Sequence, residues 1–411
     1  MDLVLRNAVI AGAPDRRVDI GIAGGKIAAI ESALSADGES IDLGGRLVGP
    51  GFVETHLHLD KSCILDRCQS RRGDLEEAIS EVAHAKASFT AEDVYKRAKA
   101  TLERCILQGT THIRTHLEVD PGIGLKGLEG VLPLVKEYAW AVDLEICIFP
   151  QEGLLNNPGT EELMLVAMRR GGSVIGACPY TDSDPRGQID RIFALARDGG
   201  FDIDMHLDFS LDPASGHADH VCRRAEEFRY GGRVSIGHVT TLSALGPADF
   251  EAAGGRLRDS GVALTALPST DLFLMGRAHQ HNVPRGVTPV HKLLHHGVNC
   301  ALATNNVLNP FTPFGDCSLL RMANLYANIA QVGTGGDVAE CFNMVTSRAA
   351  ALMNLPGYGV AVGNAADLVV LDCDTVQAAV RELAPILYVF KRGRRTVTRP
   401  LAQLHRPGGH A

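Results

Sequence analysis

The sequence contains no run of 18 consecutive apolar residues, so no membrane-spanning helix is expected. No basic segment followed by an apolar core stands near Met1, so we expect no secretory signal either. Basic residues are not in excess, because 40 Lys and Arg stand against 48 Asp and Glu and give a net charge of −8. Such a balance is a poor basis for non-specific nucleic-acid binding. We therefore expect neither a membrane nor a nucleic acid as a partner.

Several motifs of other enzyme classes are also missing. The ten cysteines form no C-x-x-C pair, which favours reduced, buried thiols in a cytoplasmic protein. There is no G-x-S-x-G, no P-loop and no P-C-x-x-C of the other zinc deaminase fold. The stretch 122–127 matches G-x-G-x-x-G, but the strand before it carries Arg114, His116 and Glu118, unlike the apolar strand of a dinucleotide-binding unit. We interpret that stretch as a simple loop.

From Arg46 onward, short apolar stretches alternate with amphipathic ones, which is typical of βα repeats around a parallel sheet. Two expected helices cover Ala91–Leu107 and His217–Tyr230. Eight units over roughly 300 residues predict a (β/α)8 barrel. The eight expected strands are Leu47–His58, Thr110–Val119, Val142–Pro150, Ser173–Pro179, Asp202–Asp208, Arg233–Val239, Val262–Leu267 and Asn299–Asn305.

Both ends of the chain are rich in short β segments. Three are expected near the start, at Leu3–Ile10, Val18–Ile22 and Lys26–Ile30, with a Gly24-Gly25 hairpin turn before the third. Three more are expected near the end, at Ala366–Asp372, Ile386–Lys391 and Arg395–Arg399. Our hypothesis is that residues 1–50 and 357–411 form one composite β domain, and that residues 51–356 form the barrel.

A histidine pair marks the end of the first barrel strand. Side chains two apart share one face of a strand, so His56 and His58 both point into the barrel. With 16 histidines in 411 residues, about 0.6 such pairs arise by chance, so the pair alone is a weak signal. A second pair, His279 and His281, lies in a polar stretch without a strand and is interpreted as loop histidines. The first pair stands in an apolar strand at the mouth where barrel active sites lie.

Two more strand ends carry a histidine. His206 closes the fifth expected strand and His238 closes the sixth. Taken singly, each is as compatible with a packed core residue as with a metal ligand. Three strand ends with inward imidazoles at one mouth favour a mononuclear metal centre with an open position for water. Such a metal would lower the pKa of the bound water and polarise an electrophilic carbon.

The sequence resembles the amidohydrolase superfamily, most closely the branch of bacterial cytosine deaminase and the N-isopropylammelide-hydrolysing enzyme. The resemblance implies a distorted (β/α)8 TIM barrel with a small β-sandwich domain formed from both chain termini. It rests on motifs from nearly the whole chain: Pro50–Ser62, Ile113–His116, Phe149–Gly153, the strand with His206, Gly237-His238 and Gly363–Leu371.

By this resemblance, His56, His58 and His206 match three ligands of one divalent metal ion, which is zinc, iron or manganese in our expectation. His238 matches the histidine that orients or deprotonates the hydrolytic water. Binuclear relatives use a carboxylated lysine on the fourth strand, whereas Ser173–Pro179 contains no lysine. The chain therefore resembles the members with a single metal.

Two positions depart from the family pattern. The family places an aspartate, as ligand and base, where this chain has Asn305, a weaker ligand. The glutamate that shuttles a proton in cytosine deaminase is replaced by Phe209, which stacks on a ring but moves no proton. We therefore expect poor turnover of cytosine. Gln151 matches a residue that hydrogen-bonds the substrate ring, although a loop-capping amide is the alternative, and Phe209 with Phe311 would supply an apolar wall.

Two charged residues have open interpretations. Asp208 shares the inward parity of His206 and is either a substitute base or a salt-bridged rim carboxylate. Lys61 either meets an anionic substrate or forms a structural ion pair. We expect a homo-oligomeric, metal-dependent hydrolase of a non-peptide C–N bond in a small cyclic amide or amidine. The alternative, favoured by Asn305 and Phe209, is a degenerate barrel that binds a ligand, or does non-hydrolytic chemistry, without a tight metal.

Overall fold

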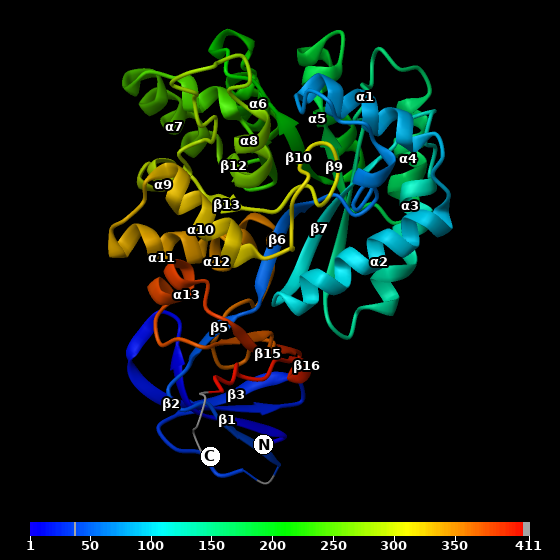
Figure 1. Cartoon of the computed structure of the whole chain (residues 1–411). Coiled ribbons are helices and arrows are strands. Elements are labelled where there is room, and N and C mark those ends of the chain that lie inside the picture. Colours follow the sequence, from blue (N-terminus) through cyan, green and yellow to red (C-terminus); the bar gives the residue numbers. More distant parts are fainter. Residues whose placement is uncertain (37, 406–411) are drawn as a thin grey trace. The chain divides into compact units, whose positions relative to one another are not determined.

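The structure is a computed structural model that describes residues 1–36 and 38–405 (Figure 1). The chain divides into two compact units. One consists of the segment up to Gly51 together with the segment from Gly357 onward, and the other of Phe52–Pro356. In the part that is described, no helix has both the length and the apolar composition that crossing a bilayer requires.

The larger unit is built around eight parallel strands that are hydrogen-bonded in chain order. They are β6 (Phe52–Leu57), β7 (Thr110–Glu118), β8 (Asp143–Phe149), β9 (Val174–Ala177), β10 (Asp202–Leu207), β11 (Val234–His238), β12 (Ala263–Ala266) and β13 (Cys300–Leu302). The ring is closed by Asn305, whose amide N donates to the His56 carbonyl at 2.8 Å, while its carbonyl accepts from the His58 amide at 3.0 Å. The predicted (β/α)8 barrel is therefore confirmed.

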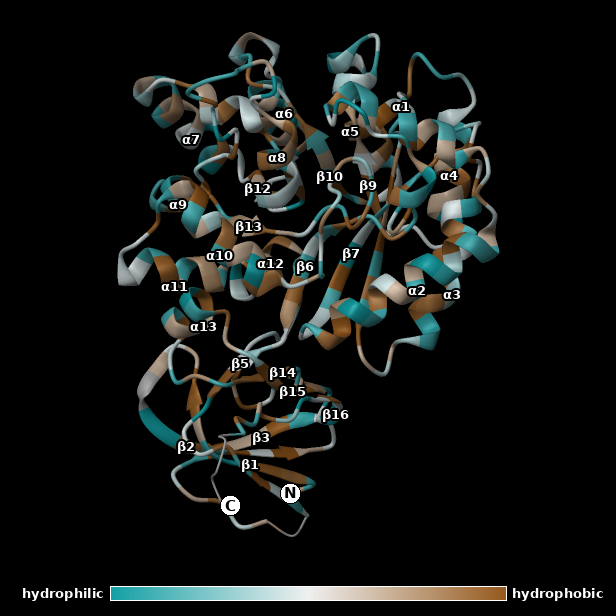
Figure 2. Cartoon of the chain, viewed as in Figure 1, coloured by the Kyte–Doolittle hydropathy of each residue, from teal (hydrophilic) through white to brown (hydrophobic). Residues whose placement is uncertain are grey.

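Helices surround these strands, as Figure 1 shows for this unit. In α2 the side chain of Thr90 accepts from the Asp93 amide and caps the first turn, and one apolar side packs inward. Figure 2 shows the resulting mixture of hydrophilic and hydrophobic residues along α2 and α7. The helices are α1 (Leu75–Lys86), α2 (Ala91–Leu107), α3 (Lys126–Glu137), α4 (Thr160–Arg170), α5 (Pro185–Gly199), α6 (Ala218–Phe228), α7 (Pro247–Ser260), α8 (Pro268–Leu274), α9 (Val290–His295), α10 (Leu319–Ala330), α11 (Gly335–Asn343) and α12 (Ser347–Leu352).

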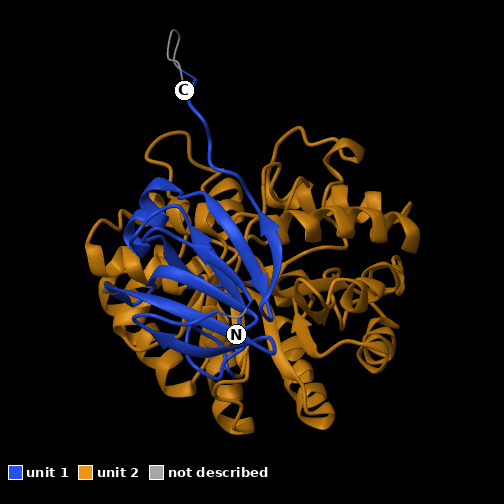
Figure 3. Cartoon of the chain, turned by 90° about the horizontal axis from the view of Figure 1, so that it is seen from below, with its two compact units in different colours: residues 1–51, 357–411 blue, residues 52–356 orange. Residues whose placement is uncertain are grey.

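The smaller unit joins both chain ends in one sheet, shown in blue in Figure 3. The order is β16-β15-β14-β5-β1-β2-β3, with β4 also paired to β1, and the junction is the antiparallel pair of β5 with β14. Its apolar core draws on both ends, for example Leu5, Val48 and Phe390. The elements are β1 (Leu3–Ile10), β2 (Ala13–Ala23), β3 (Lys26–Glu31), β4 (Glu39–Asp42), β5 (Leu47–Pro50), β14 (Leu368–Leu371), α13 (Val376–Glu382), β15 (Ile386–Lys391) and β16 (Arg394–Thr398).

The expected first barrel strand, Leu47–His58, is in fact two strands. Its first part is β5, which pairs with β1 and β14 in the smaller unit. Its second part is β6, which pairs with β7 in the barrel. The stretch reads as one strand because both parts are apolar and buried, and hydropathy does not reveal that their partners differ.

Candidate metal centre and active site

Three imidazole rings meet at the C-terminal mouth of the barrel. His206 Nε2 lies 2.9 Å from His56 Nε2 and 3.0 Å from His58 Nε2. His56 lies at the end of β6 and His58 directly after it. The His58 amide still donates to the Asn305 carbonyl, so the extended pairing continues and alternation places both rings on the inner face. His206 comes from β10 and meets them at the same point, and all three side chains are buried.

This group of nitrogens fits a divalent metal ion. Three ring nitrogens that converge on one point cannot all be satisfied by hydrogen bonds among themselves. The Nδ1 atom of His58 lies 3.1 Å from the His116 carbonyl and donates to it, which leaves the lone pair of Nε2 directed at the centre. Burial is the largest cause that lowers the pKa of each of the three rings well below its usual value. Neighbouring imidazoles add to this effect in all three, and Lys61 adds to it for His58 and His206. Neutral imidazoles are the form that binds a metal.

Asn305 lies beside the three histidines, directly after β13. Its backbone adopts a left-handed conformation with φ of 65°, which asparagine tolerates better than most residues. Its side-chain oxygen and nitrogen are buried and have no hydrogen-bond partner in the described part of the chain. An amide oxygen without a partner in this place is available to a metal ion or to a bound ligand. Whether Asn305 is a ligand stays a prediction.

A second group of potential ligands lies deeper in the barrel. His116, which the sequence analysis did not assign to the site, stacks on His56 with 3.8 Å between ring centroids. Its Nε2 atom is 3.4 Å from Asp204 Oδ1. However, the Arg114 guanidinium is only 2.8 Å from the other Asp204 oxygen, and this fixed positive charge disfavours a second cation. The arrangement therefore favours one metal ion on His56, His58 and His206.

His238 at the end of β11 is paired with a buried carboxylate. Its Nδ1 atom lies 2.6 Å from Asp271 Oδ1, and the other Asp271 oxygen accepts from the Leu267 amide at 3.1 Å. Burial raises the pKa of Asp271, while the adjacent His238 opposes this rise. With the proton on Nδ1 donated to Asp271, the Nε2 atom of His238 is left as a proton acceptor. This pair has the geometry of a histidine base with an orienting carboxylate.

Asp271 was not predicted as a site residue from the sequence. The residue lies in the first turn of α8, which begins with Pro268 directly after β12. A proline at the first helical position followed by an acid in the first turn is a usual helix start, so the pattern has an ordinary structural explanation. Only its position directly after a barrel strand could have marked it as a candidate, because barrel active sites are built from these loops.

A small cavity lies next to the histidines and brings together most of the predicted site residues. A larger groove, of about 690 Å³, lies against the other side of α8. It is lined by none of His56, His58 and His206, which we call the metal group. The cavity is lined by His58, Lys61, Gln151, Tyr180, His206, Phe209, His238, Thr270, Asn305, Asn306 and Phe311.

The side chains that line the cavity are held in defined orientations. Phe209 packs on the His238 ring with 3.9 Å between centroids, and the Phe311 ring lies 4.5 Å from the Lys61 ammonium. Gln151 accepts from Lys61 Nζ at 3.1 Å and donates to the Cys178 sulfur at 3.4 Å. These partners are side chains from other elements, so Gln151 is not a loop-capping amide. Its contact with a substrate stays a prediction.

Of the two charged residues with open interpretations, Lys61 lines the cavity and Asp208 does not. The Asp208 carboxylate accepts from the amides of His217 and Ala218 at 2.8 and 3.0 Å, so it caps the start of α6 and is not part of the cavity wall. The inward parity expected for Asp208 was wrong, because β10 ends at Leu207 and Asp208 is left-handed with φ of 49°. Lys61 forms the structural ion pair, 2.6 Å from Glu118, and also borders the cavity.

Comparisons with known proteins agree with this architecture. A model of the amidohydrolase family matches residues 39–132 and 144–397. N-isopropylammelide isopropyl amidohydrolase of Pseudomonas sp. (strain ADP) is 29% identical over 403 residues, which cover 96% of each chain. Pterin deaminase of Rhizobium rhizogenes is 29% identical over 362 residues, covering 86% of this chain and 82% of the relative.

The crystal structure of 5-methylcytosine deaminase from Klebsiella pneumoniae, liganded with 5-fluorocytosine, is also similar. It superimposes with a TM-score of 0.94 and 29% sequence identity, over 99% of this chain and 100% of that one. Since the family model spans most of the sequence, the chain belongs to the amidohydrolase family.

Proposed function

We propose that this protein is a metal-dependent amidohydrolase or deaminase of a small, flat nitrogen heterocycle. As a member of its family it is a hydrolase of carbon–nitrogen bonds other than peptide bonds. The observation that carries the finer proposal is that His56 Nε2 and His58 Nε2 both lie within 3.0 Å of His206 Nε2, beside a cavity walled by Phe209 and Phe311. Relatives named for ammelide, pterin and 5-methylcytosine substrates support a cyclic amide or amidine.

A divalent metal bound to the three histidines would activate water and withdraw electrons from the carbon under attack. The protein's own residues then handle the substrate and the proton. Phe209 and Phe311 offer ring faces for a flat heterocycle, and Gln151 offers a fixed amide to its polar edge. His238 receives a proton at Nε2, because Asp271 holds the proton at Nδ1.

The cavity wall contains no carboxylate, because none of the residues that line it is an aspartate or glutamate. The ionisable groups that border it, apart from the metal-binding histidines, are His238, Lys61 and the phenol of Tyr180. Proton transfer to the leaving group therefore depends on an imidazole, an ammonium group or a phenol. This is the feature that separates the proposed chemistry from that expected of a cytosine deaminase with its shuttling carboxylates.

The proposal is tested by supplying zinc-, iron- or manganese-loaded protein with a panel of heterocycles. The panel contains aminopyrimidines, including cytosine and 5-methylcytosine, together with pterins and alkylamino-triazines. We expect release of ammonia or an alkylamine from at least one of these classes, and loss of that release after chelation. Absence of product from the whole panel with every metal would contradict the proposal.

Cytosine is expected to be a poor substrate. General acid–base assistance is worth roughly 10² to 10⁴ in rate, and Asn305 and Phe209 cannot provide it. The Asn305→Asp, Phe209→Glu double variant should therefore raise kcat/KM for cytosine about ten-fold or more, measured as ammonia release. Phe314→Glu, at a 58% exposed phenylalanine, is the control for the added charge and should have no effect. Rapid turnover of cytosine by the wild-type protein would mean that other residues provide the proton path.

Gln151 gives a further prediction. Its amide has defined partners and borders the cavity, so Gln151→Ala should remove a substrate hydrogen bond and raise KM roughly ten-fold. The measurement is steady-state kinetics on the best substrate of the panel. Gln69→Ala serves as the control, because Gln69 is exposed and does not line the cavity. Unchanged kinetics in Gln151→Ala would assign Gln151 a purely structural role.

A further inference from the structure

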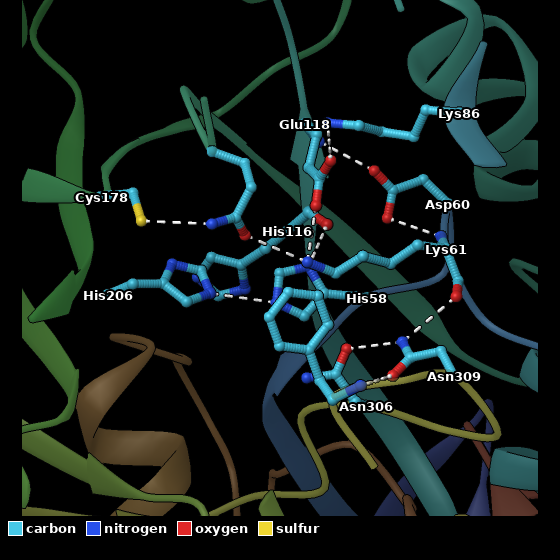
Figure 4. A network of polar contacts seen from close by, with 12 residues as sticks. His58, Asp60, Lys61, Lys86, His116, Glu118, Cys178, His206, Asn306 and Asn309 are labelled. Atoms are coloured by element: carbon cyan, nitrogen blue, oxygen red, sulfur yellow. Dashed lines mark hydrogen bonds and ion pairs between the residues drawn. The ribbon is translucent and has the colours of Figure 1, made fainter. Parts of the chain in front are cut away.

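A buried lysine of α1 lies outside the cavity wall and pairs with carboxylates near it. Lys86, the last residue of α1, places its ammonium 2.6 Å from Glu118 and 2.6 Å from Glu152, with Asp120 at 3.4 Å. Burial opposes its charge, but the carboxylates outweigh this and raise the pKa of Lys86. Figure 4 shows Lys86 reaching one end of the Glu118 side chain, while Lys61 reaches the same side chain beside His58. Lys86 contacts neither the metal group nor the cavity.

Glu118, at the end of β7, connects the two lysines. One of its oxygens accepts from Lys86 and the other from Lys61, both at 2.6 Å. Burial alone would raise the pKa of Glu118, but the two ammonium groups lower it to about 2. The Asp60 carboxylate fixes the backbone of this pair, because it accepts from the amides of Glu118 and Lys61 at 2.8 and 2.9 Å. The Glu118 carboxylate is therefore ionised and held rigidly between the Lys61 and Lys86 ammonium groups.

Lys61 links Glu118 to the cavity, because its side chain contacts both. Besides its bond to Glu118, its ammonium donates to the Gln151 oxygen at 3.1 Å and lies 4.5 Å from the centre of the Phe311 ring. An ammonium group has three donors, and these two bonds use two of them. The position of the third donor, and the orientation of the Gln151 amide, both depend on how Lys61 is held between Glu118 and Gln151.

We propose that Lys86 is a positioning residue for the substrate cavity, acting through Glu118 on Lys61 and Gln151. If Lys86 is removed, one Glu118 oxygen loses its cation and attracts the Lys61 ammonium. Lys61 then moves toward Glu118 and away from Gln151, so both groups present a different face to the substrate. This inference rests on the proposed function, since it assumes that Lys61 and Gln151 bind the substrate.

The test is a double-mutant cycle in the metal-loaded full chain. Lys86→Met is expected to lower kcat/KM about ten- to a hundred-fold, a range that matches coupling energies between residues of one network. In the Lys61→Met background the same change should cost less than about three-fold, because the residue through which it acts is gone. Lys96→Met removes an exposed lysine paired with Glu92 on α2 and should be neutral. Metal content and Tm are measured for every variant.

Equal losses from Lys86→Met in both backgrounds would overturn the proposal, because they would show a purely structural effect. So would unchanged kinetics in the single variant. If Lys86→Met does not fold, Lys86→Arg keeps the charge and carries the test: its bulkier guanidinium should displace Lys61 and reduce kcat/KM about three-fold or more, again only when Lys61 is present.

A second measurement is independent of turnover. In ¹⁵N-lysine-labelled protein, the ammonium signal of Lys61 is identified by its loss in Lys61→Met. That signal should shift in Lys86→Arg and stay in place in Lys96→Met, whereas an unshifted signal in Lys86→Arg would overturn the proposal. If no compound of the panel is turned over, the proposed function fails, but this spectrum still shows whether Lys86 positions Lys61.

Discussion

The His206→Ala variant is expected to lose its metal ion and, with it, all measurable turnover. His206 Nε2 lies within 3.0 Å of both His56 Nε2 and His58 Nε2, so its removal leaves only the His56 and His58 pair of the predicted site. Mutation of a residue that supports a metal ligand typically lowers metal affinity roughly ten- to a hundred-fold, and loss of the ligand itself should lower it at least as much. Elemental analysis of protein grown with added zinc, iron or manganese gives the measurement.

The control for this variant is His84→Ala, which removes an exposed histidine on α1 and should leave the metal content unchanged. Wild-type protein should contain close to one metal per chain. A content well below one after loading with each metal, together with no effect of chelation, would contradict the metal centre. Such a result would favour a degenerate barrel that binds a ligand without a tight metal. The structural reason would be Asn305, because its neutral side chain is a weaker ligand than a carboxylate.

The Asp271→Asn variant should lose activity almost as severely while keeping its metal. A neutral amide opposite Nδ1 no longer selects the tautomer that leaves Nε2 of His238 free to accept a proton. Loss of an orienting aspartate of this kind lowers kcat by roughly 10³ to 10⁴, and KM should change little because Asp271 lies behind His238. The measurement is kcat and KM on the best substrate, alongside metal content.

The protein offers a matched control for this change. Asp190 pairs with His220 at 2.7 Å, nearly the same distance as in the buried pair, but on the outer surface of the barrel unit. Asp190→Asn should therefore leave kcat unchanged. If Asp271→Asn retains more than about a third of the wild-type kcat, His238 does not act as the base and the proton must leave through another group.

The meeting of four histidines at one mouth was predictable because it depends on strand alternation and on where barrel strands end. Alternation along β6 places His56 and His58 on one face, and parallel strands of a barrel all end at the same mouth, which adds His206 and His238. These rules require strand ends but no knowledge of which helices pack together. The same holds for the order of the barrel strands, which follows the chain.

The rest of the site depends on where each strand stops and on contacts across the fold. Asp208 was misplaced because its backbone is left-handed directly after β10, which breaks the alternation of the strand. Asp271 lies in a helix that has an ordinary reason for an acid in its first turn. Lys86 is 32 positions from Glu118 in the sequence, so no motif joins them. Such pairs become visible only when the tertiary packing is known.

The antiparallel pairing of β5 with β14 has a consequence for how the chain is made. A ribosome synthesises β5 before the barrel segment, whereas its hydrogen-bonding partner β14 emerges only after that segment. Until then β5 presents an unpaired edge, the kind of surface on which chains associate wrongly. The barrel segment can assemble during this interval because its strands pair in chain order. Nascent chains stalled before residue 368 should therefore depend most on chaperones, and removing β14 to β16 should reduce soluble yield far more than their short length suggests.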